Sequence, residues 1–232
     1  MTQITNLGHS GFSVETDTHF LIFDYSEGVL PTPPETKTTL VFVSHHHPDH
    51  FNPEIFSLKE TVPNVHYYIS DDIYESRVRR YIDSGYTMVH PMDDLKISAR
   101  FRLKVLPSTD CGVAYLVCLC GKNYFHAGDL NLWLWDTMSE PEAYSMVNAF
   151  EKYTSNLKNF IIDYAFLPLD TRLGIYSYLG FDYYMKHFKI QHAIPMHFFG
   201  SPRITRELIE SPISLKYRSK IITLDPGNRI EQ

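Results

Sequence analysis

The stretch that decides how this chain folds is Ser44-His45-His46-His47-Pro48-Asp49-His50, which directly follows an apolar run. Side chains two residues apart in an extended segment point to the same side, so His45 and His47 can bind one metal ion together. Asp49 and His50 follow a proline that ends the extension, and they can turn back toward a second ion. We therefore expect a site for two metal ions just after this predicted strand.

His46 alternates away from its two neighbours, so it is interpreted as a residue that packs or faces solvent and binds no metal. The alternative for the whole stretch is a solvated, histidine-rich loop without a specific role. The preceding apolar run, Thr39–Val43, argues against that alternative because it places the histidines in register at the end of a strand.

The whole chain has the composition of a compact protein: it has 232 residues, of which 44% are hydrophobic and 21% are charged. This length and composition predict a single domain over residues 1–232 and exclude a disordered or collagen-like chain. The net charge is −6. Because nucleic-acid affinity comes largely from Lys and Arg at phosphates, a nucleic-acid partner is disfavoured and a small-molecule substrate is expected.

We expect a cytoplasmic protein. The first basic residue is Lys37, so the N-terminus lacks the charged region of a secretory signal peptide. The longest apolar run, Val113–Cys120, is far shorter than the roughly 20 residues of a membrane-spanning helix. The three cysteines lack zinc-finger spacing and are expected to be reduced thiols.

Hydrophobic periodicity predicts many short strands first and alternating helices and strands later, which is typical of an α/β protein. The predicted strands are Gly11–Glu15, His19–Asp24, Thr39–Ser44, Tyr67–Ser70, Phe101–Pro107, Val113–Cys120, Asn123–His126, Phe160–Leu169 and His192–Met196. Helices are predicted within Glu140–Asn159, over Tyr176–Phe188 and after Pro202. Ser139, Pro141 and Glu142 supply the cap, first-turn proline and acidic residue of a helix start.

The pattern H-x-H-x-D-H after a hydrophobic strand resembles the metal-binding signature of the metallo-β-lactamase superfamily. Three further segments carry the same resemblance: Leu7–Phe12 with Phe20–Asp24, His126-Ala127-Gly128-Asp129, and Pro195-Met196-His197-Phe198. The first pair is similar to the branch that contains the ascorbate-6-phosphate lactonases. The resemblance implies a four-layer αββα sandwich, with two sheets face to face and helices outside.

The resemblance also implies the ligands of a dinuclear centre. Where many family members carry a further histidine, this chain has Asp110, and a carboxylate can take that ligand position. The implied sets are His45, His47 and Asp110 for the first metal, Asp49, His50 and His197 for the second, and Asp129 as the bridge. The extra carboxylate weakens any exclusive claim for zinc. We expect two divalent ions, zinc first, with manganese or iron as alternatives.

Four more residues are candidates for a supporting role or for the substrate pocket. Asp24 would orient a ligand histidine, with a strand-terminal turn residue as the alternative. His9 either lines the pocket or caps the first turn. Asp170 and Arg172 follow a strand and form either a pocket-lining pair or an ordinary surface ion pair.

The predicted activity is metal-dependent hydrolysis of a small ester, lactone or phosphodiester. Two cations lower the pKa of a bridging water from about 15.7 to around 7, so no serine or cysteine nucleophile is required. Asp49, which could also orient the nucleophile, and Asp129 are the predicted catalytic residues. The alternatives are a nuclease of the same superfamily and a non-hydrolytic module, either di-iron or ligand-binding.

Overall fold

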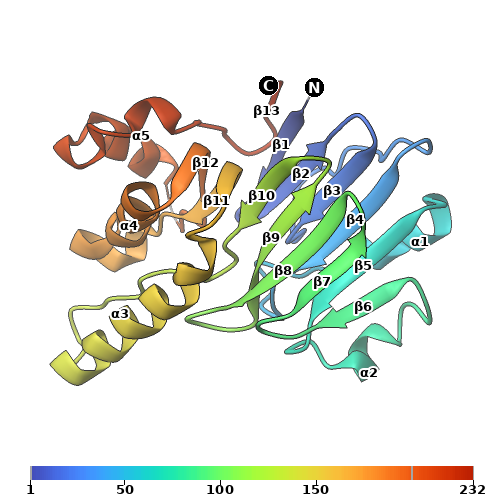
Figure 1. Ribbon diagram of the computed structural model, residues 1–232, viewed down its shortest axis with the longest axis horizontal. Helices are drawn as coiled ribbons and strands as arrows, with labels where there is room; N and C mark the ends of the chain where they lie inside the picture. The colour runs from blue at the N-terminus through green and yellow to red at the C-terminus, as the bar shows by residue number, and fades with distance from the viewer. Residues whose placement is uncertain (1, 200, 232) are drawn as a thin grey trace. The chain divides into compact units, whose positions relative to one another are not determined.

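The computed structural model describes residues 2–199 and 201–231, which fall into two compact units. The first unit is Met1–His90 with Leu224–Gln232, and the second unit is Pro91–Thr223. Each unit is built around its own mixed β-sheet with helices beside it (Figure 1). The single domain expected over residues 1–232 stays a prediction.

The first unit contains a seven-stranded sheet with the order β13-β1-β2-β3-β4-β5-β6. Neighbouring strands from β13 to β3 are antiparallel, whereas those from β3 to β6 are parallel. The strands are β1 Gln3–Gly8, β2 Gly11–Glu15, β3 His19–Phe23, β4 Thr38–Val43, β5 Val65–Ser70, β6 Tyr86–Val89 and β13 Arg229–Glu231.

Short helices cover the parallel part of this sheet: α1 Leu58–Thr61, which continues a 3₁₀ segment over Pro53–Ser57, and α2 Glu75–Val78. Val41 and Val43 of β4 and Tyr67 of β5 are buried in one apolar cluster with Phe56 and Val78 from these helical segments. Side chains alternate along β4, and the residues on its other face are buried as well. Parallel strands buried on both faces explain the nearly continuous apolar runs in the sequence.

The second unit contains a six-stranded sheet with the order β12-β11-β10-β9-β8-β7. Strands β7 to β10 are antiparallel, and β10, β11 and β12 are parallel. The strands are β7 Asp94–Ser98, β8 Phe101–Pro107, β9 Val113–Leu119, β10 Lys122–His126, β11 Ile161–Pro168 and β12 Lys189–Met196.

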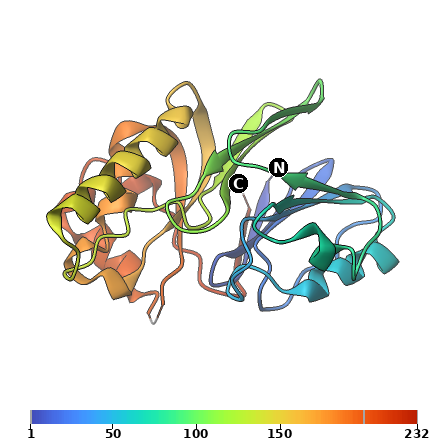
Figure 2. The same ribbon diagram turned by 90° about the horizontal axis from the view of Figure 1, so that it is seen from below.

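The α-helices in the described part of the second unit are α3 Glu140–Thr154, α4 Leu179–His187 and α5 Arg203–Glu210 (Figure 2). The predicted start of α3 is confirmed, because Ser139 and Glu142 form a reciprocal capping box. Phe150 of α3 packs on Tyr184 of α4, which in turn packs on Phe125 of β10, with ring centroids 5.2 and 5.7 Å apart. These rings hold both helices against the sheet beside the end of β10.

The predicted strands and helices are confirmed with shifts of one to a few residues at their ends. The helix predicted over Tyr176–Phe188 begins later, at Leu179, because the preceding residues form a 3₁₀ segment with a kink at Gly174. Within the described part of the chain, none of the helices is long and apolar enough to cross a membrane.

Candidate metal centre

Most of the candidate site residues follow the carboxyl ends of parallel strands, whereas Asp110 follows the antiparallel strand β8. Asp24 follows β3 and the histidine-rich stretch follows β4 in the first unit. Asp129 follows β10, Asp170 follows β11 and His197 follows β12 in the second unit. This edge is where loops of α/β sheets collect functional side chains, because the strand ends diverge and leave room for them.

In the first unit, the buried Asp24 carboxylate organises the end of β4. Its Oδ1 accepts the backbone N–H of Ser44 at 2.7 Å, and its Oδ2 accepts the Ser44 hydroxyl at 2.5 Å. The same Oδ2 lies 2.8 Å from Nδ1 of His50. A carboxylate only accepts, so Nδ1 of His50 carries the proton and the lone pair is on Nε2, the form of histidine that binds metal ions.

His45 and His47 converge as their spacing predicts. Nε2 of His45 lies 3.1 Å from Nδ1 of His47, and Nδ1 of His45 lies 2.9 Å from the Ser44 hydroxyl. His46 points elsewhere: its side chain is 47% exposed and its Nδ1 lies 2.7 Å from Asp72. His46 therefore faces solvent, which is one of the two placements expected for it, and its exclusion from the metal ligands stays a prediction.

His9 and Asp49 form a contact in the first unit that the sequence spacing does not indicate. Nε2 of His9 lies 3.2 Å from Oδ2 of Asp49. Burial raises the pKa of the Asp49 carboxyl, but the hydrogen bond to His9 and the nearby His50 outweigh burial and hold that pKa well below its usual range. Asp49 is therefore a carboxylate at neutral pH.

The donor atoms of the first unit suit a divalent transition metal ion. His9, Asp49 and His50 each offer a nitrogen or oxygen within 4.8 Å of the others, and so do His45 and His47 as a pair. Imidazole with carboxylate is the donor combination of zinc, iron and manganese sites. These residues fit the expected metal ions by their chemistry.

In the second unit, the loop after β10 presents Asp129, whose side chain is almost fully buried. Its backbone carbonyl accepts the indole N–H of Trp133 at 2.8 Å. The Thr109 hydroxyl donates to the carbonyl of Asn131 at 2.6 Å and accepts the N–H of the same residue at 3.0 Å. Thr109 thereby ties the loop before β9 to the loop that carries Asp129.

Asp110 follows Thr109 and lies beside Asp129, with carboxylate oxygens of the two residues within 4.8 Å of each other. Two carboxylates this close repel one another unless a cation or a proton lies with them, so the pair suits a cation. The backbone N–H of Asp110 donates to the Ser108 hydroxyl at 3.2 Å, which shapes the turn before β9.

His197 is held by two carboxylates of the second unit. Its Nε2 lies 3.3 Å from Oδ1 of Asp129, and its Nδ1 lies 3.1 Å from Oδ2 of Asp170. Asp170 is fully buried and also binds the guanidinium of Arg172 through both oxygens. Burial raises the pKa of Asp170, but the hydrogen bonds from His197 and Arg172 outweigh it and lower that pKa. The pair Asp170 and Arg172 is therefore more than a surface ion pair.

The backbone at several of these residues is in the left-handed region. His9, Asp24 and His197 have φ angles of 39°, 42° and 62°. This conformation costs a residue other than glycine about 1 kcal/mol or more, and such strain concentrates at functional sites.

Within each unit, the structure brings several of the candidate site residues together. In the first unit these are His9, Asp24, His45, His47, Asp49 and His50, and in the second Asp110, Asp129, Asp170, Arg172 and His197. Ser44 and Thr109 were not singled out, although each connects site residues. In the sequence, Ser44 and Thr109 are marked only by a hydroxyl group next to a candidate ligand. Because serine and threonine are common at strand ends, this feature does not distinguish them from other residues.

Comparison with known proteins identifies the family and the fold. Residues 3–134 match the family described as the beta-lactamase superfamily domain. A "UPF0173 metal-dependent hydrolase" of Korarchaeum cryptofilum is 27% identical over 246 aligned positions, which cover 100% of both chains.

Two solved structures illustrate the shared fold. Igni18, a metallo hydrolase from Ignicoccus hospitalis, has a TM-score of 0.71 at 18% identity, covering 99% of this chain and 97% of that one. The metallo-beta-lactamase fold protein YhfI of Bacillus subtilis has a TM-score of 0.67 at 14% identity, covering 100% of both. The predicted fold class is thereby confirmed: two mixed sheets flanked by helices, in the metallo-β-lactamase fold.

Proposed function

Because this chain belongs to the beta-lactamase superfamily domain family, we propose that it is a metal-dependent hydrolase of a small ester, lactone or phosphodiester. Its partner is then a small-molecule substrate. The name of the archaeal relative supports metal-dependent hydrolysis. The substrate classes are those whose carbonyl or phosphoryl centre a metal-activated hydroxide attacks.

One observation carries the proposal: each unit contains a buried carboxylate that holds a candidate ligand histidine by Nδ1. Asp24 holds His50 at 2.8 Å in the first unit, and Asp170 holds His197 at 3.1 Å in the second. Such carboxylates fix the tautomer and raise the basicity of a metal-binding imidazole. Burying a carboxylate costs free energy, so this arrangement at two strand ends fits a functional demand on both histidines.

We assign the ligands as the sequence resemblance orders them. His45, His47 and Asp110 serve the first ion, Asp49, His50 and His197 serve the second, and Asp129 serves both. His9 contacts Asp49 and is the strongest candidate for an additional donor, because it shares the short-range cluster with Asp49 and His50. The donor set is rich in imidazole, which favours zinc, and manganese and iron remain compatible with its carboxylates.

Two divalent ions held by these residues would supply a hydroxide nucleophile near neutral pH and would polarise the scissile carbonyl or phosphoryl group. The chain contributes the orientation of the reacting groups. Asp49 is ionised at neutral pH and would orient the attacking water by accepting a hydrogen bond from it. Trp133, with its ring centroid 5.5 Å from that of His197, limits access of bulk water to this side of the histidine.

Metal analysis with an activity screen tests the proposal. The purified chain is loaded with zinc, manganese or iron and assayed against lactones, thioesters, phosphodiesters and short RNA. We expect hydrolysis of a small substrate that is lost with a chelator and restored by the metal. Cleavage of RNA alone would identify a nuclease, and an iron-specific absorption spectrum without hydrolysis would identify a redox module; either result overturns the proposed function.

A further inference from the structure

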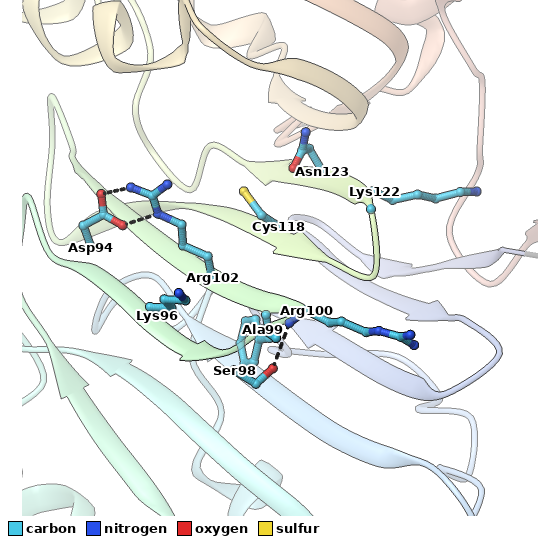
Figure 3. A pocket seen from close by; sticks show the side chains of 11 residues that line it. Asp94, Lys96, Ser98, Ala99, Arg100, Arg102, Cys118, Lys122 and Asn123 are labelled. Carbon is cyan, nitrogen blue, oxygen red and sulfur yellow. Dashed lines mark hydrogen bonds and ion pairs between the residues drawn. The ribbon is translucent and has the colours of Figure 1, made fainter.

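The second unit contains a concave surface that shares no residue with the candidate metal ligands. We call it the β7–β10 groove. It has a volume of about 860 Å³ and lies at the turn ends of strands β7, β8, β9 and β10 (Figure 3). Its lining residues include Asp94, Lys96, Arg100, Arg102, Lys122 and Asn123.

Strand register explains why these side chains face one another. Lys96 of β7 pairs with Arg102 of β8, Arg102 pairs with Cys118 of β9, and Cys118 pairs with Asn123 of β10. Residues directly opposite on neighbouring strands project from the same face of a sheet. One row across four strands thus presents an ammonium, a guanidinium, a thiol and an amide to the groove.

The groove carries an excess of positive charge. Four of its lining residues are basic, namely Lys96, Arg100, Arg102 and Lys122, whereas Asp94 is the one acidic residue among the described residues that line it. The Asp94 carboxylate accepts two hydrogen bonds of 2.6 Å from Arg102 and also pairs with Lys104. The single carboxylate of the groove is therefore shared between Arg102, which lines the groove, and Lys104, which does not. This positive excess occurs in a chain whose net charge is −6.

Two of the groove cations have no neighbouring carboxylate among the described residues. Among residues 2–199 and 201–231, the side chains of Lys96 and Arg100 have no carboxylate within 4.0 Å. Both are exposed, and Figure 3 shows Arg100 and Lys122 reaching from the two turns that end the groove. A patch of like charges raises the free energy of the folded chain unless an anion lowers it, and mixed-charge surfaces are the usual solution.

We propose that the β7–β10 groove binds a small molecule that carries several phosphate groups. Arginine and lysine together provide forked and single donors for phosphate oxygens. The volume lies within the range of about 300 to 1,000 Å³ that is usual for small-molecule sites, and it is too small for a folded partner. A long nucleic acid would contact the negatively charged remainder of the chain, which disfavours it. This proposal stands independently of the hydrolase function.

Isothermal titration with sodium tripolyphosphate tests the proposal on the purified, metal-loaded chain. We expect saturable binding that weakens as salt rises, and binding of orthophosphate that is weaker by about tenfold or more, because fewer groove cations are engaged. The double variant K96E/R100E should weaken tripolyphosphate binding by about tenfold or more. Asp94→Asn removes the competing carboxylate and should strengthen binding.

Matched variants separate groove binding from other effects. K189E/R206E makes the same charge change at exposed positions of β12 and α5 and should leave the affinity within about twofold of wild type. Asp129→Ala removes a candidate metal ligand and should also retain tripolyphosphate binding. The proposal is overturned if both double variants lose affinity equally, if only Asp129→Ala loses it, or if an RNA 12-mer binds more tightly through Lys96 and Arg100.

Discussion

Oδ2 of Asp170 lies 3.1 Å from Nδ1 of His197, and the same carboxylate receives the guanidinium fork of Arg172. Asp170 is fully buried, and it follows β11 just as His197 follows the adjacent parallel strand β12. The parallel pairing therefore sets the carboxylate beside the imidazole. The guanidinium completes the hydrogen bonding of a buried charge that would otherwise be costly.

We predict that Asp170→Asn lowers metal affinity by about 10 to 100-fold, because an amide is a weaker partner than a carboxylate for the proton on Nδ1 of His197. Equilibrium dialysis with zinc measures the loss. Asp136→Asn, at an exposed position of the same unit, is the control and should bind metal like wild type. If the metal affinity of Asp170→Asn is unchanged, Asp170 does not orient His197 for metal binding.

Asp110 is the position at which the sequence resemblance implies a carboxylate ligand in place of a further histidine. Asp110→Ala should lower metal content and activity strongly, whereas Asp110→His should retain metal and shift its preference toward zinc, because imidazole is the softer donor. Metal quantification on the folded variants decides the matter. If the alanine variant retains its full metal content, Asp110 is not a ligand.

Gly180 lies in α4 where an added Cβ would meet the side-chain oxygen of Asn131 and approach the Leu132 nitrogen to 3.2 Å. Asn131 is buried and its backbone is bound by Thr109, so it has little room to move. Gly180→Ala should therefore lower the free energy of unfolding by about 1 to 3 kcal/mol, although alanine favours helices by about 1 kcal/mol over glycine. Urea denaturation measures the change in the free energy of unfolding. A variant more stable than wild type would show that the loop containing Asn131 moves to accommodate the added methyl group.

Asp94 should make stability depend on pH. Arg102 is the main cause, despite the opposing effect of partial burial, and with Lys104 it holds the pKa of Asp94 well below its usual range. The folded chain then binds fewer protons than the unfolded chain as pH falls below about 4, and the stabilisation is lost. Asp94→Asn should lower stability at pH 7 by about 1 kcal/mol or less, as expected for a half-exposed network. Denaturation at pH 7 and pH 3 should show that the difference in unfolding free energy between wild type and Asp94→Asn is smaller at pH 3. A larger difference at pH 3 would contradict a lowered pKa of Asp94.

The sequence predicted the buried apolar strands well and several strands at or next to sheet edges poorly. Strands β4 and β11 are buried apolar runs with turn residues after them, so periodicity finds them. Strands β1, β6, β7 and β13 were not predicted. β7 is exposed along most of its length, and β13 is three residues long and pairs with β1 from the other end of the chain. Neither strand carries a local pattern that distinguishes it from a loop.

The candidate ligands could be predicted from the sequence, but the hydrogen bonds that support them could not. The candidate ligands occur in dense local motifs that follow apolar strands, so their spacing identifies them. The contacts of Ser44 with Asp24 and of Thr109 with Asn131 join residues 20 and 22 positions apart. Such contacts depend on which strands become neighbours, and a single sequence does not state that order.

Metal content of wild type and Asp129→Ala, measured by plasma mass spectrometry after equilibrium with zinc, tests the central claim most directly. Asp129 is assigned to both ions, so we predict about two ions per wild-type chain and loss of both metal and hydrolysis in Asp129→Ala. His46→Ala, at a solvent-facing position in the same histidine-rich stretch, should match wild type. A single ion per wild-type chain, with full metal and activity in Asp129→Ala, would contradict the account.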